Sequence, residues 1–222
     1  MREQDPNNRW LASQNPRRLE AEFVRDNALS IAGLLNPEIG GPPSHPYQPG
    51  GYYENLQFPD RDYHADKDAS QYRRGLYTHW QRTFLHPMLA NFDAPSREEC
   101  TAARTVANTP QQALTLLNDP TFVEASRAFA TRLLSGNADD AAHLAAAFDL
   151  ALARPIKPRE AESLTAFLGQ QREYYRAHPE DTAKLLKIGL TPAPTQIDGA
   201  ELAAWTQVTR VVLNLHETIT RY

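Results

Sequence analysis

The chain has 222 residues, a mass of 25.0 kDa and a formal net charge of −4. This size suffices for one domain with a hydrophobic core, and the charge argues against a strongly basic nucleic-acid-binding protein. The single cysteine excludes an intrachain disulfide and a zinc site built from several thiolates, and no CxxCH motif for haem c attachment is present. With no apolar run of about 18 residues, we expect no membrane span. Residues 1–10 do not have the apolar core of a signal peptide.

The spacing of apolar residues predicts an all-α fold, an irregular helical bundle in a single domain over residues 1–222. The first helix is expected over 16–35, with Leu19, Phe23 and Ile31 on its apolar face. Its charged residues are expected on the remaining, exposed surface: Arg17, Arg18, Glu22, Arg25 and Asp26.

The segment from 36 to 71 is expected to be a long ordered loop. It contains the helix-breaking strings Gly40-Gly41-Pro42-Pro43 and Pro49-Gly50-Gly51. A disordered linker is usually poor in aromatic residues. This segment, in contrast, contains Tyr47, Tyr52, Tyr53, Phe58 and Tyr63. We therefore expect it to wrap over the helical body, either as a functional loop or as a strap that covers apolar surface.

The rest of the chain is expected to be helical. A short helix over 72–84, stopped by Pro87, precedes a helix that begins with the capping-box pattern Ser96-Arg97-Glu98-Glu99. Thr109-Pro110-Gln111-Gln112 has the same pattern, and Asp119 is expected to cap the following helix. The remaining helices are expected over 139–153, 158–178, 182–189 and 199–221. No segment alternates as a strand would.

Motifs for metal, phosphate and serine chemistry are not found. The seven histidines form no HExxH motif and no pair at four-residue spacing, so no metal site is predicted. The acidic segment 60–68 does not have the glycine and distal glutamate of a calcium loop and is interpreted as a solvated charge run. Neither a G-x-S-x-G elbow nor a phosphate-binding glycine loop is present.

Cys100 is the only thiol. It is expected near the start of a helix, where the helix dipole and the flanking Arg97 and Arg104 would favour a reactive thiolate. The alternative, which we favour, is a small buried side chain, because most lone cysteines behave as buried hydrophobes.

The densest group of candidate binding residues lies between 72 and 119. Guanidinium forks bind carboxylate or sulfate groups, and aromatic faces stack on sugar rings or cations. The alternative is structural and we favour it, because short acids and amides are turn and cap residues and arginines bind loop carbonyls. The ligand-binding candidates are Arg73, Arg74, Tyr77, Trp80, Arg82, Asp93, Arg97, Glu98, Cys100, Arg104, Asn108 and Asp119.

Several strings of this sequence resemble a known bacterial family. The most specific are FDAPSREEC at 92–100 and NTPQQALTLLNDP at 108–120. RRLEAEFVRDNALSIAGLLN at 17–36, GGPPSHPYQP at 40–49 and LAAWTQVTRVVLNLHETITR at 202–221 resemble further segments of it. The family is the planctomycete-specific PSD-type domain, domain of unknown function fifteen-fifty-three, and the resemblance is to its C-terminal portion.

This resemblance implies a module of a larger exported protein in the periplasm or cell envelope. It implies haem c on an upstream cytochrome domain and no cofactor in this chain. The implied partners are the upstream domains of the same protein, a sulfatase-like exported neighbour and a polysaccharide, with no nucleic acid. The family has no established catalytic residues to carry over. Because the haem motif and the upstream half are not in this sequence, we interpret it as a fragment.

Three functional hypotheses follow. The first is a non-catalytic binding or scaffold module of a cytochrome-associated exported protein linked to polysaccharide use. The second is a carbohydrate-active enzyme in which Asp93 and either Glu98 or Glu99 are the acid–base groups. The third is a redox role for Cys100. We prefer the first because the sequence contains no recognisable catalytic constellation, and whether the chain is an enzyme stays open.

Overall fold

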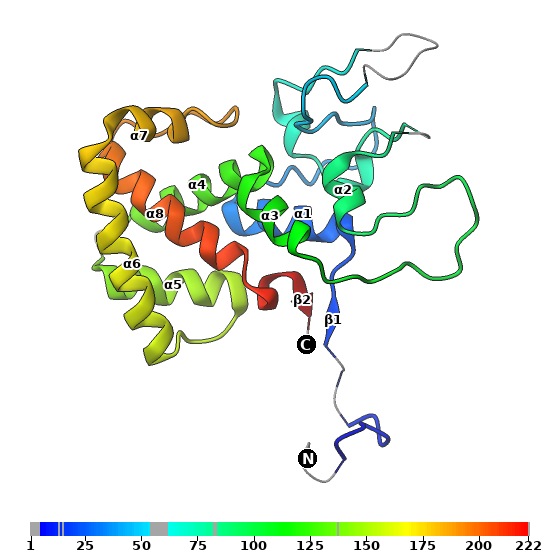
Figure 1. Cartoon of the computed structure of the whole chain (residues 1–222), viewed down its shortest axis with the longest axis horizontal. Helices are drawn as coiled ribbons and strands as arrows, with labels where there is room; N and C mark the ends of the chain where they lie inside the picture. Colours follow the sequence, from blue (N-terminus) through cyan, green and yellow to red (C-terminus); the bar gives the residue numbers. More distant parts are fainter. Residues whose placement is uncertain are drawn as a thin grey trace.

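The computed structural model describes residues 5–12, 14, 16–53, 62–81, 84–136 and 138–221. Over these residues the fold is all-α, as predicted, and the strands form only one short antiparallel pair. Figure 1 shows a body of helices with long loops gathered on one side and an N-terminal segment that stands away from the body. Among the described helices, none combines the length and the apolar character that a bilayer crossing requires.

Two central helices form the core of the body. α4 (Pro120–Leu134) packs against α8 (Gly199–Leu213), and the side chains between them are fully buried. α1 (Ala21–Ala32) covers α4 and α6 (Pro158–Ala177) covers α8. Each large apolar side chain removed from water here contributes about 1.5–3 kcal/mol. Trp205 at the centre of α8 is completely buried, so it is among the largest of these contributions.

Shorter elements surround this core. They are β1 (Arg17–Arg18), α2 (Pro87–Asn91), α3 (Pro110–Asn118), α5 (Asp140–Leu152), α7 (Pro179–Leu186) and β2 (Thr220–Arg221). The two strands pair antiparallel, so the segment before α1 is joined to the C-terminal end of the described chain.

Two of the predicted helix caps are present. The Asp119 Oδ1 accepts a hydrogen bond from the Thr121 N–H at 2.9 Å at the start of α4. At the start of α3, the Gln112 side chain accepts a hydrogen bond from the Thr109 N–H at 3.4 Å. These caps satisfy backbone donors that have no partner within the helix.

The helix predicted over 72–84 is wrong. The chain forms 3₁₀ turns at Ala69–Tyr72 and Gly75–Tyr77 and then continues without helix. The cause is tertiary: an added Cβ on Gly75 would lie 2.9 Å from the Glu22 Cα, so this segment is pressed against α1. Pro87, expected to stop a helix, instead begins α2, where its missing N–H costs nothing.

The helix predicted to begin at Ser96 is also wrong. Arg97 has a φ of +62°, a left-handed value, and the chain stays irregular from 94 to 109. The Ser96 hydroxyl accepts a long bond of 3.4 Å from the Glu98 N–H, which is a local turn and not a capping box. The serine–glutamate pattern therefore forms a turn here, and the apolar residues that follow it, such as Val106, stay exposed and do not support a helix.

Three other predicted helices have different ends. The first begins at Ala21, because residues 17–18 pair with β2 in place of a helical turn. The helix expected over 182–189 occupies Pro179–Leu186. The last ends at Leu213 and is followed by a 3₁₀ turn, His216–Ile219.

α1 buries charged residues that were predicted to be exposed and exposes Phe23, while Ile31 is buried as predicted. Glu22, Arg25 and Asp26 are buried, with Arg25 only 1% exposed, whereas Phe23 is 48% exposed. The Arg25 guanidinium donates to the backbone carbonyls of Gln71 and Arg73, each at 2.5 Å. The charged face of α1 therefore lies under the long loop, and its phenylalanine faces out. Periodicity could not show this, because it does not reveal which face another segment will cover.

The long loop is ordered in its described parts, 36–53 and 62–71, as expected of a strap. The Tyr52 hydroxyl donates to the Leu85 carbonyl at 3.0 Å, and the Tyr63 hydroxyl donates to the Pro46 carbonyl at 2.5 Å. Tyr53 is buried, and its ring lies edge-on to that of Tyr63 with centroids 5.5 Å apart. Phe58, also expected in this group, lies outside the described residues.

Glu124 of α4 joins three segments that are far apart in the sequence. It is 1% exposed and accepts hydrogen bonds from the Tyr47 hydroxyl at 2.8 Å and the Tyr72 hydroxyl at 2.7 Å. It also accepts one from the Thr191 N–H at 2.7 Å. A buried carboxylate without such donors would be strongly destabilising, so these bonds hold the long loop and the segment after α7 against α4.

Gly189 makes the Glu124 contacts possible, which generates a first prediction. Its φ is +92°, and an added Cβ would lie 2.1 Å from the Glu124 Cδ. We expect Gly189→Ala to lower the free energy of unfolding by about 2–4 kcal/mol, measured by urea denaturation. The control Gly169→Ala, in α6 with nothing within 4 Å of the added Cβ, should raise it by about 0.5–1 kcal/mol. Equal effects at the two positions would contradict this account.

Candidate functional site

Two of the candidates, Arg73 and Tyr77, lie beside the long loop and bind its Gly40–Pro42 part. The Arg73 guanidinium is buried and donates to the backbone carbonyls of Gly40 and Pro42. It also lies over the Tyr77 ring, 4.1 Å from the ring centroid. The Tyr77 hydroxyl accepts a hydrogen bond from the Gly40 N–H at 2.9 Å. These contacts match the structural alternative, in which arginines bind loop carbonyls.

Arg74 is the neighbouring candidate and is partly exposed. Its Nε lies 3.8 Å from the Asp26 carboxylate, which accepts a shorter hydrogen bond from the Gly75 N–H at 2.6 Å. Burial raises the pKa of Asp26 above its ordinary value despite that bond and the nearby arginines. Arg74 therefore retains donors that face solvent.

Asp93, which precedes the irregular 94–109 segment, is hydrogen-bonded to Ala107 near the other end of that segment. The Arg18 Nη2 lies 2.6 Å from its carboxylate, and the Ala107 N–H donates to the same oxygen at 2.9 Å. Arg18 also donates to the backbone carbonyls of Ala107 and Phe92. Burial opposes ionisation of Asp93, but these hydrogen bonds outweigh it and lower the pKa of the carboxyl. A general acid needs a raised pKa, so this environment does not favour that role.

The same segment is held at two further points. The Arg104 guanidinium donates to both carboxylate oxygens of Glu22, at 2.6 and 3.2 Å. The Arg97 guanidinium stacks over the Trp80 ring at 3.6 Å from the centroid, and the Trp80 indole N–H donates to the Ser96 carbonyl at 3.2 Å. Each of these candidates therefore contacts a protein partner.

The other candidates lie in different places. Glu98, Cys100 and Asn108 are exposed on the irregular segment, and Arg82 lies outside the described residues. The exposure of Cys100 contradicts the buried position that we favoured, because the helix expected around it does not form. Asp119 caps α4 and lines a separate hollow beside α3. The candidates thus do not meet at one site.

In its described part the acidic segment is exposed at Asp62 and Asp68, as predicted of a solvated run, but Asp66 differs. The Asp66 carboxylate accepts a hydrogen bond from the His45 N–H at 2.7 Å and lies 3.5 Å from the His45 Nδ1. The His45 ring stacks on His79 with centroids 4.7 Å apart. No group of three or more potential metal-ligating side chains occurs among the residues that the structure places.

His86 is a buried histidine that the sequence did not single out. It is 3% exposed, and its Nε2 lies 3.0 Å from the Tyr47 carbonyl. Burial lowers the pKa of His86 to about 4, with a further contribution from the charge of Arg25. The ring is therefore neutral at physiological pH and helps to fix the long loop beside α2.

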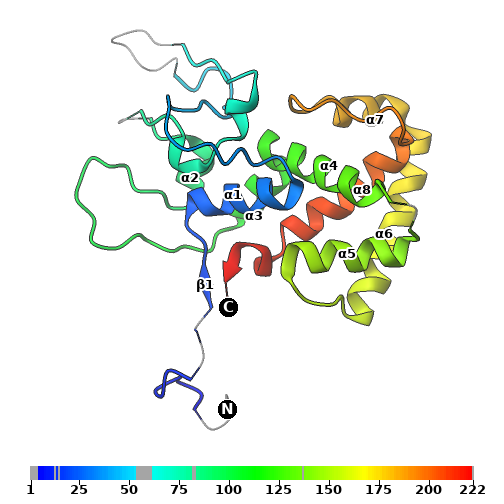
Figure 2. The same ribbon diagram turned by 180° about the vertical axis from the view of Figure 1, so that it is seen from behind.

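Phe23 was predicted to lie on the apolar, buried face of the first helix, but it lies in a groove on the surface. Two adjoining hollows, of about 370 and 100 Å³, share Leu19, Phe23 and Arg221 as lining residues. Leu35 adds to the apolar surface, and Figure 2 shows α1 at the surface on this side with β1 leading into it. We call this surface the Phe23 groove. Charged residues of both signs line it: Arg17, Arg18, Arg74 and Arg221, together with Glu20 and Asp26.

Sequence reasoning missed the groove because Phe23 fits the apolar stripe of α1. The signal that could have revealed it is the number of charged residues on the opposite face, since a short helix with Glu22, Arg25 and Asp26 clustered together needs partners for them. The segment that supplies those partners cannot be identified from the sequence, so the charged residues of α1 were assigned to the exposed surface.

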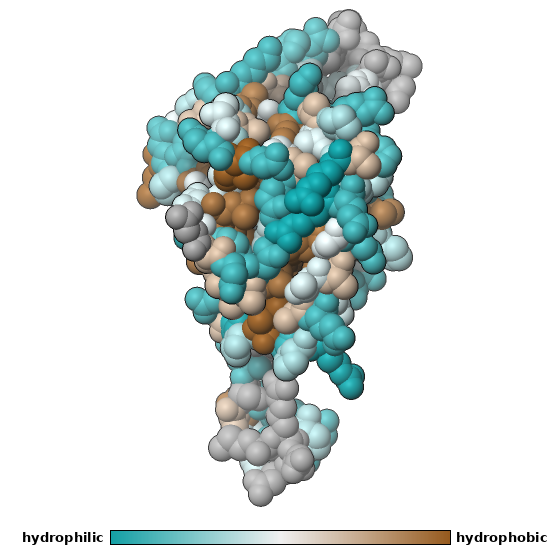
Figure 3. Space-filling view, turned by 90° about the vertical axis from the view of Figure 1, so that its left-hand side faces the viewer, coloured by the Kyte–Doolittle hydropathy of each residue, from teal (hydrophilic) through white to brown (hydrophobic). Residues whose placement is uncertain are grey.

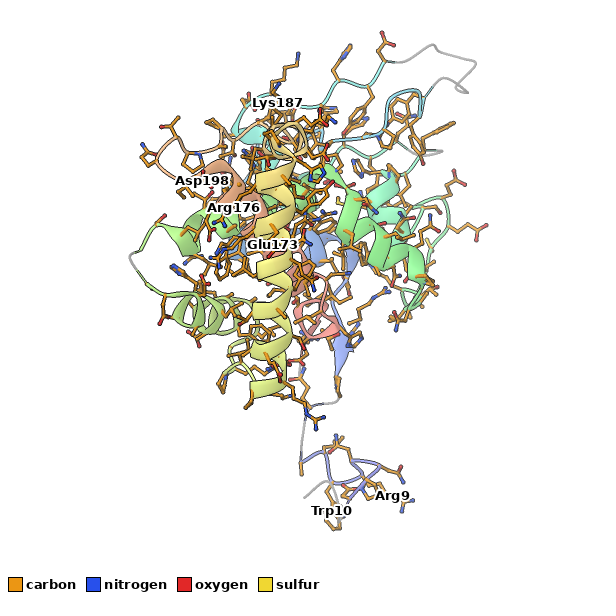
Figure 4. The ribbon with its side chains drawn as sticks, turned by 60° about the vertical axis from the view of Figure 1, so that its left-hand side comes forward. Arg9, Trp10, Glu173, Arg176, Lys187 and Asp198 are labelled. Carbon is orange, nitrogen blue, oxygen red and sulfur yellow. The ribbon has the colours of Figure 1, made fainter. Side chains whose placement is uncertain are left out.

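The side of the molecule that carries α6 mixes polar and apolar surface (Figure 3). Figure 3 shows polar side chains over much of the face that includes α6, with smaller apolar patches between them. Glu173 and Arg176 extend from α6 there, while Arg9 and Trp10 lie on the N-terminal segment away from the body (Figure 4). Trp10 is 70% exposed.

A second prediction concerns Asp93. We expect Asp93→Asn to lower the free energy of unfolding by about 2 kcal/mol, because Arg18 loses its charged partner in a partly buried site. Trypsin should also cut more rapidly at Arg97 and Arg104. The exposed control Glu98→Gln should change neither quantity. If Asp93→Asn kept full stability and unchanged proteolysis, the structural role assigned to Asp93 would be wrong.

A third prediction concerns pH. The unfolded chain protonates His86 near its ordinary pKa of 6.5, whereas the folded protein does so only near 4. The stability that the neutral ring contributes is thus present above pH 6.5 and is lost as the pH falls to 4, by about 3 kcal/mol in total. Urea unfolding across this range should give a shallower pH dependence for His86→Gln than for the wild type. The exposed control His64→Gln should keep the wild-type dependence, and a wild-type slope in His86→Gln would refute the assignment.

Comparison with known proteins gives a family and no function. No curated protein and no solved structure matches this chain significantly. The model of the PSD1 family, described as a protein of unknown function (DUF1553), matches residues 1–168. The matched region includes the long loop, the irregular 94–109 segment and the Phe23 groove residues of α1, whereas α8 lies beyond it. Because the match covers more than half of the sequence, this chain belongs to the PSD1 family (DUF1553).

Proposed function

We propose that this chain is a non-catalytic docking module that binds another protein domain through the Phe23 groove. The observation that carries the proposal is the exposure of Phe23, a large apolar residue 48% exposed on a helix whose charged residues are buried. A lone exposed apolar side chain is common on a protein surface, but Phe23 lies with Leu19 and Leu35 in one hollow, and a contiguous apolar surface of this kind marks an interaction site.

The chemistry of the groove indicates the kind of partner. Leu19, Phe23 and Leu35 supply apolar surface, and Arg17, Arg74 and Arg221 lie around it. Arginines that surround an apolar centre are typical of protein interfaces, where they pair with carboxylates at the rim. Glu20 and Asp26 also line the groove, 3.9 and 3.8 Å from Arg17 and Arg74, so the complementary surface would be apolar, with a carboxylate expected opposite Arg221.

Among the described residues, the candidates do not assemble into one reactive site, and this also supports docking in place of catalysis. The Arg18–Asp93, Arg104–Glu22 and Arg97–Trp80 contacts all hold the irregular 94–109 segment in place. The carboxyl that the enzymatic hypothesis needs as an acid, Asp93, is ion-paired and has a lowered pKa. The second hypothesis is therefore weaker. Cys100 is exposed, as the redox hypothesis requires, but the helix expected to favour its thiolate does not form, and Arg97 and Arg104 contact Trp80 and Glu22.

The wider role is an extension of the family resemblance. We place the module in a larger exported bacterial protein, next to a cytochrome domain that carries haem c, with a role in polysaccharide use. The partner of the Phe23 groove would then be an upstream domain of the same protein.

A fourth prediction tests the groove in the isolated chain. With its partner absent, the exposed groove should cause reversible self-association, seen as a sedimentation coefficient that rises with protein concentration. Phe23→Ser should abolish this rise, because it removes the apolar centre. Leu150→Ser, at a 40% exposed leucine on α5, is the matched control and should behave as the wild type. A chain that stays monomeric at every concentration, or a loss of association in both variants, would argue against the docking proposal.

A further inference from the structure

A second hollow lies on a different part of the surface. It has a volume of about 440 Å³ and is formed by α2, α3, the first residues of α4 and the Gln48–Pro49 part of the long loop. We call it the Asp119 hollow. It shares no lining residue with the Phe23 groove. Its walls combine apolar side chains, among them Met88 and Leu114, with four carboxamides and one carboxylate.

Asp119 is the single charged side chain among the residues that line this hollow. One of its oxygens accepts the capping hydrogen bond from the Thr121 N–H. No arginine, lysine or histidine of the described chain comes within ion-pair distance of its carboxylate. Arg25 acts on it through space but gives its donors to backbone carbonyls. The charge of Asp119 is thus only partly compensated, and burial raises the pKa of its carboxyl.

Two carboxamides of the hollow use an amide N–H within the protein, whereas Gln48 leaves one buried donor, Nε2, and one buried acceptor, Oε1, without a partner in the described structure. The Asn91 Nδ2 donates to the Thr115 hydroxyl at 2.9 Å, and the Asn118 Nδ2 donates to the Leu114 carbonyl at 3.0 Å. No described group donates to the carbonyl oxygen of either amide.

These features favour a donor-rich cation over a sugar. A primary ammonium has three donors and no acceptor, which suits a carboxylate and unused amide oxygens. A sugar hydroxyl both donates and accepts, and sugar rings usually stack on an aromatic face, whereas the lining of this hollow contains no aromatic residue. The methylene groups of an aliphatic amine would contact Met88 and Leu114.

We propose that the Asp119 hollow binds a primary ammonium carried on a short aliphatic chain, such as the side chain of a lysine. The ammonium would bind the Asp119 carboxylate and the carbonyl oxygens of Asn91 and Asn118. This site is independent of docking at the Phe23 groove, since the two share no residue.

The test is a titration of the full ¹⁵N-labelled chain, monitored through its backbone and side-chain amide signals. N-acetyl-lysine methylamide and n-butylamine are the two ammonium probes, and they distinguish a peptide side chain from a free amine. N-acetyl-norleucine methylamide, with no ammonium, and methyl glucoside are the controls. We expect saturable shifts of the Asn91 and Asn118 side-chain signals with the ammonium probes, and at least about tenfold weaker binding of the norleucine probe.

Variants then assign the binding to Asp119. Asp119→Asn should weaken binding of the ammonium probes about tenfold while keeping the helix cap, because asparagine caps as well as aspartate. Asp119→Ser, which also caps, should act in the same way. Asp139→Asn, at the cap of α5, is the matched control and should bind as the wild type.

Several outcomes would overturn the proposal. They are equal binding of the norleucine and lysine probes, wild-type affinity in Asp119→Asn, saturable shifts with methyl glucoside alone, or no saturable shift with either amine. The Phe23→Ser variant should bind the ammonium probes as the wild type does, so failure of this site and failure of the docking proposal can be told apart.

Discussion

Buried charge is the constraint on which this structure depends. Arg25 of α1 and Glu124 of α4 are each about 1% exposed, and a charge removed from water needs hydrogen-bond partners. Both find them in segments outside their own helices: Arg25 in the carbonyls of Gln71 and Arg73, and Glu124 in Tyr47, Tyr72 and Thr191. The long loop supplies Gln71 to Arg25 and Tyr47 to Glu124, so it is part of the folded core, and without it each charge would have fewer partners.

This constraint also explains why the residues most suggestive of chemistry do not form one site. Arginine, tyrosine and short acids are the side chains that an active site uses, but they are also the ones that satisfy buried charges and loop carbonyls. Arg73, Asp93 and Arg104 serve this second purpose. The surfaces left available are of a different kind: an apolar groove lined by charged residues of both signs, and a hollow with one carboxylate among amides.

Much of the helical framework was predictable from sequence. Most helices of the second half were placed to within a few residues, because their caps, such as Asp119, and their apolar spacing agree, although the last one ends at Leu213 and not at 221. Agreement was lost between 72 and 109, where Gly75 is pressed against α1 and Arg97 adopts a left-handed conformation. In that region local propensity was overruled by contacts with α1, which is about 50 residues or more away along the chain.

The sequence alone was sufficient for the all-α class, the ordered character of the long loop and the family, since these depend on spacing, aromatic content and short strings. The face that α1 turns to solvent, the partners of the candidate arginines and the position of Cys100 emerged only once the chain was folded. The physical reason is that burial is a property of pairs of segments. Phe23 and Arg25 lie two positions apart, and which one is covered depends on a loop that begins after the helix ends.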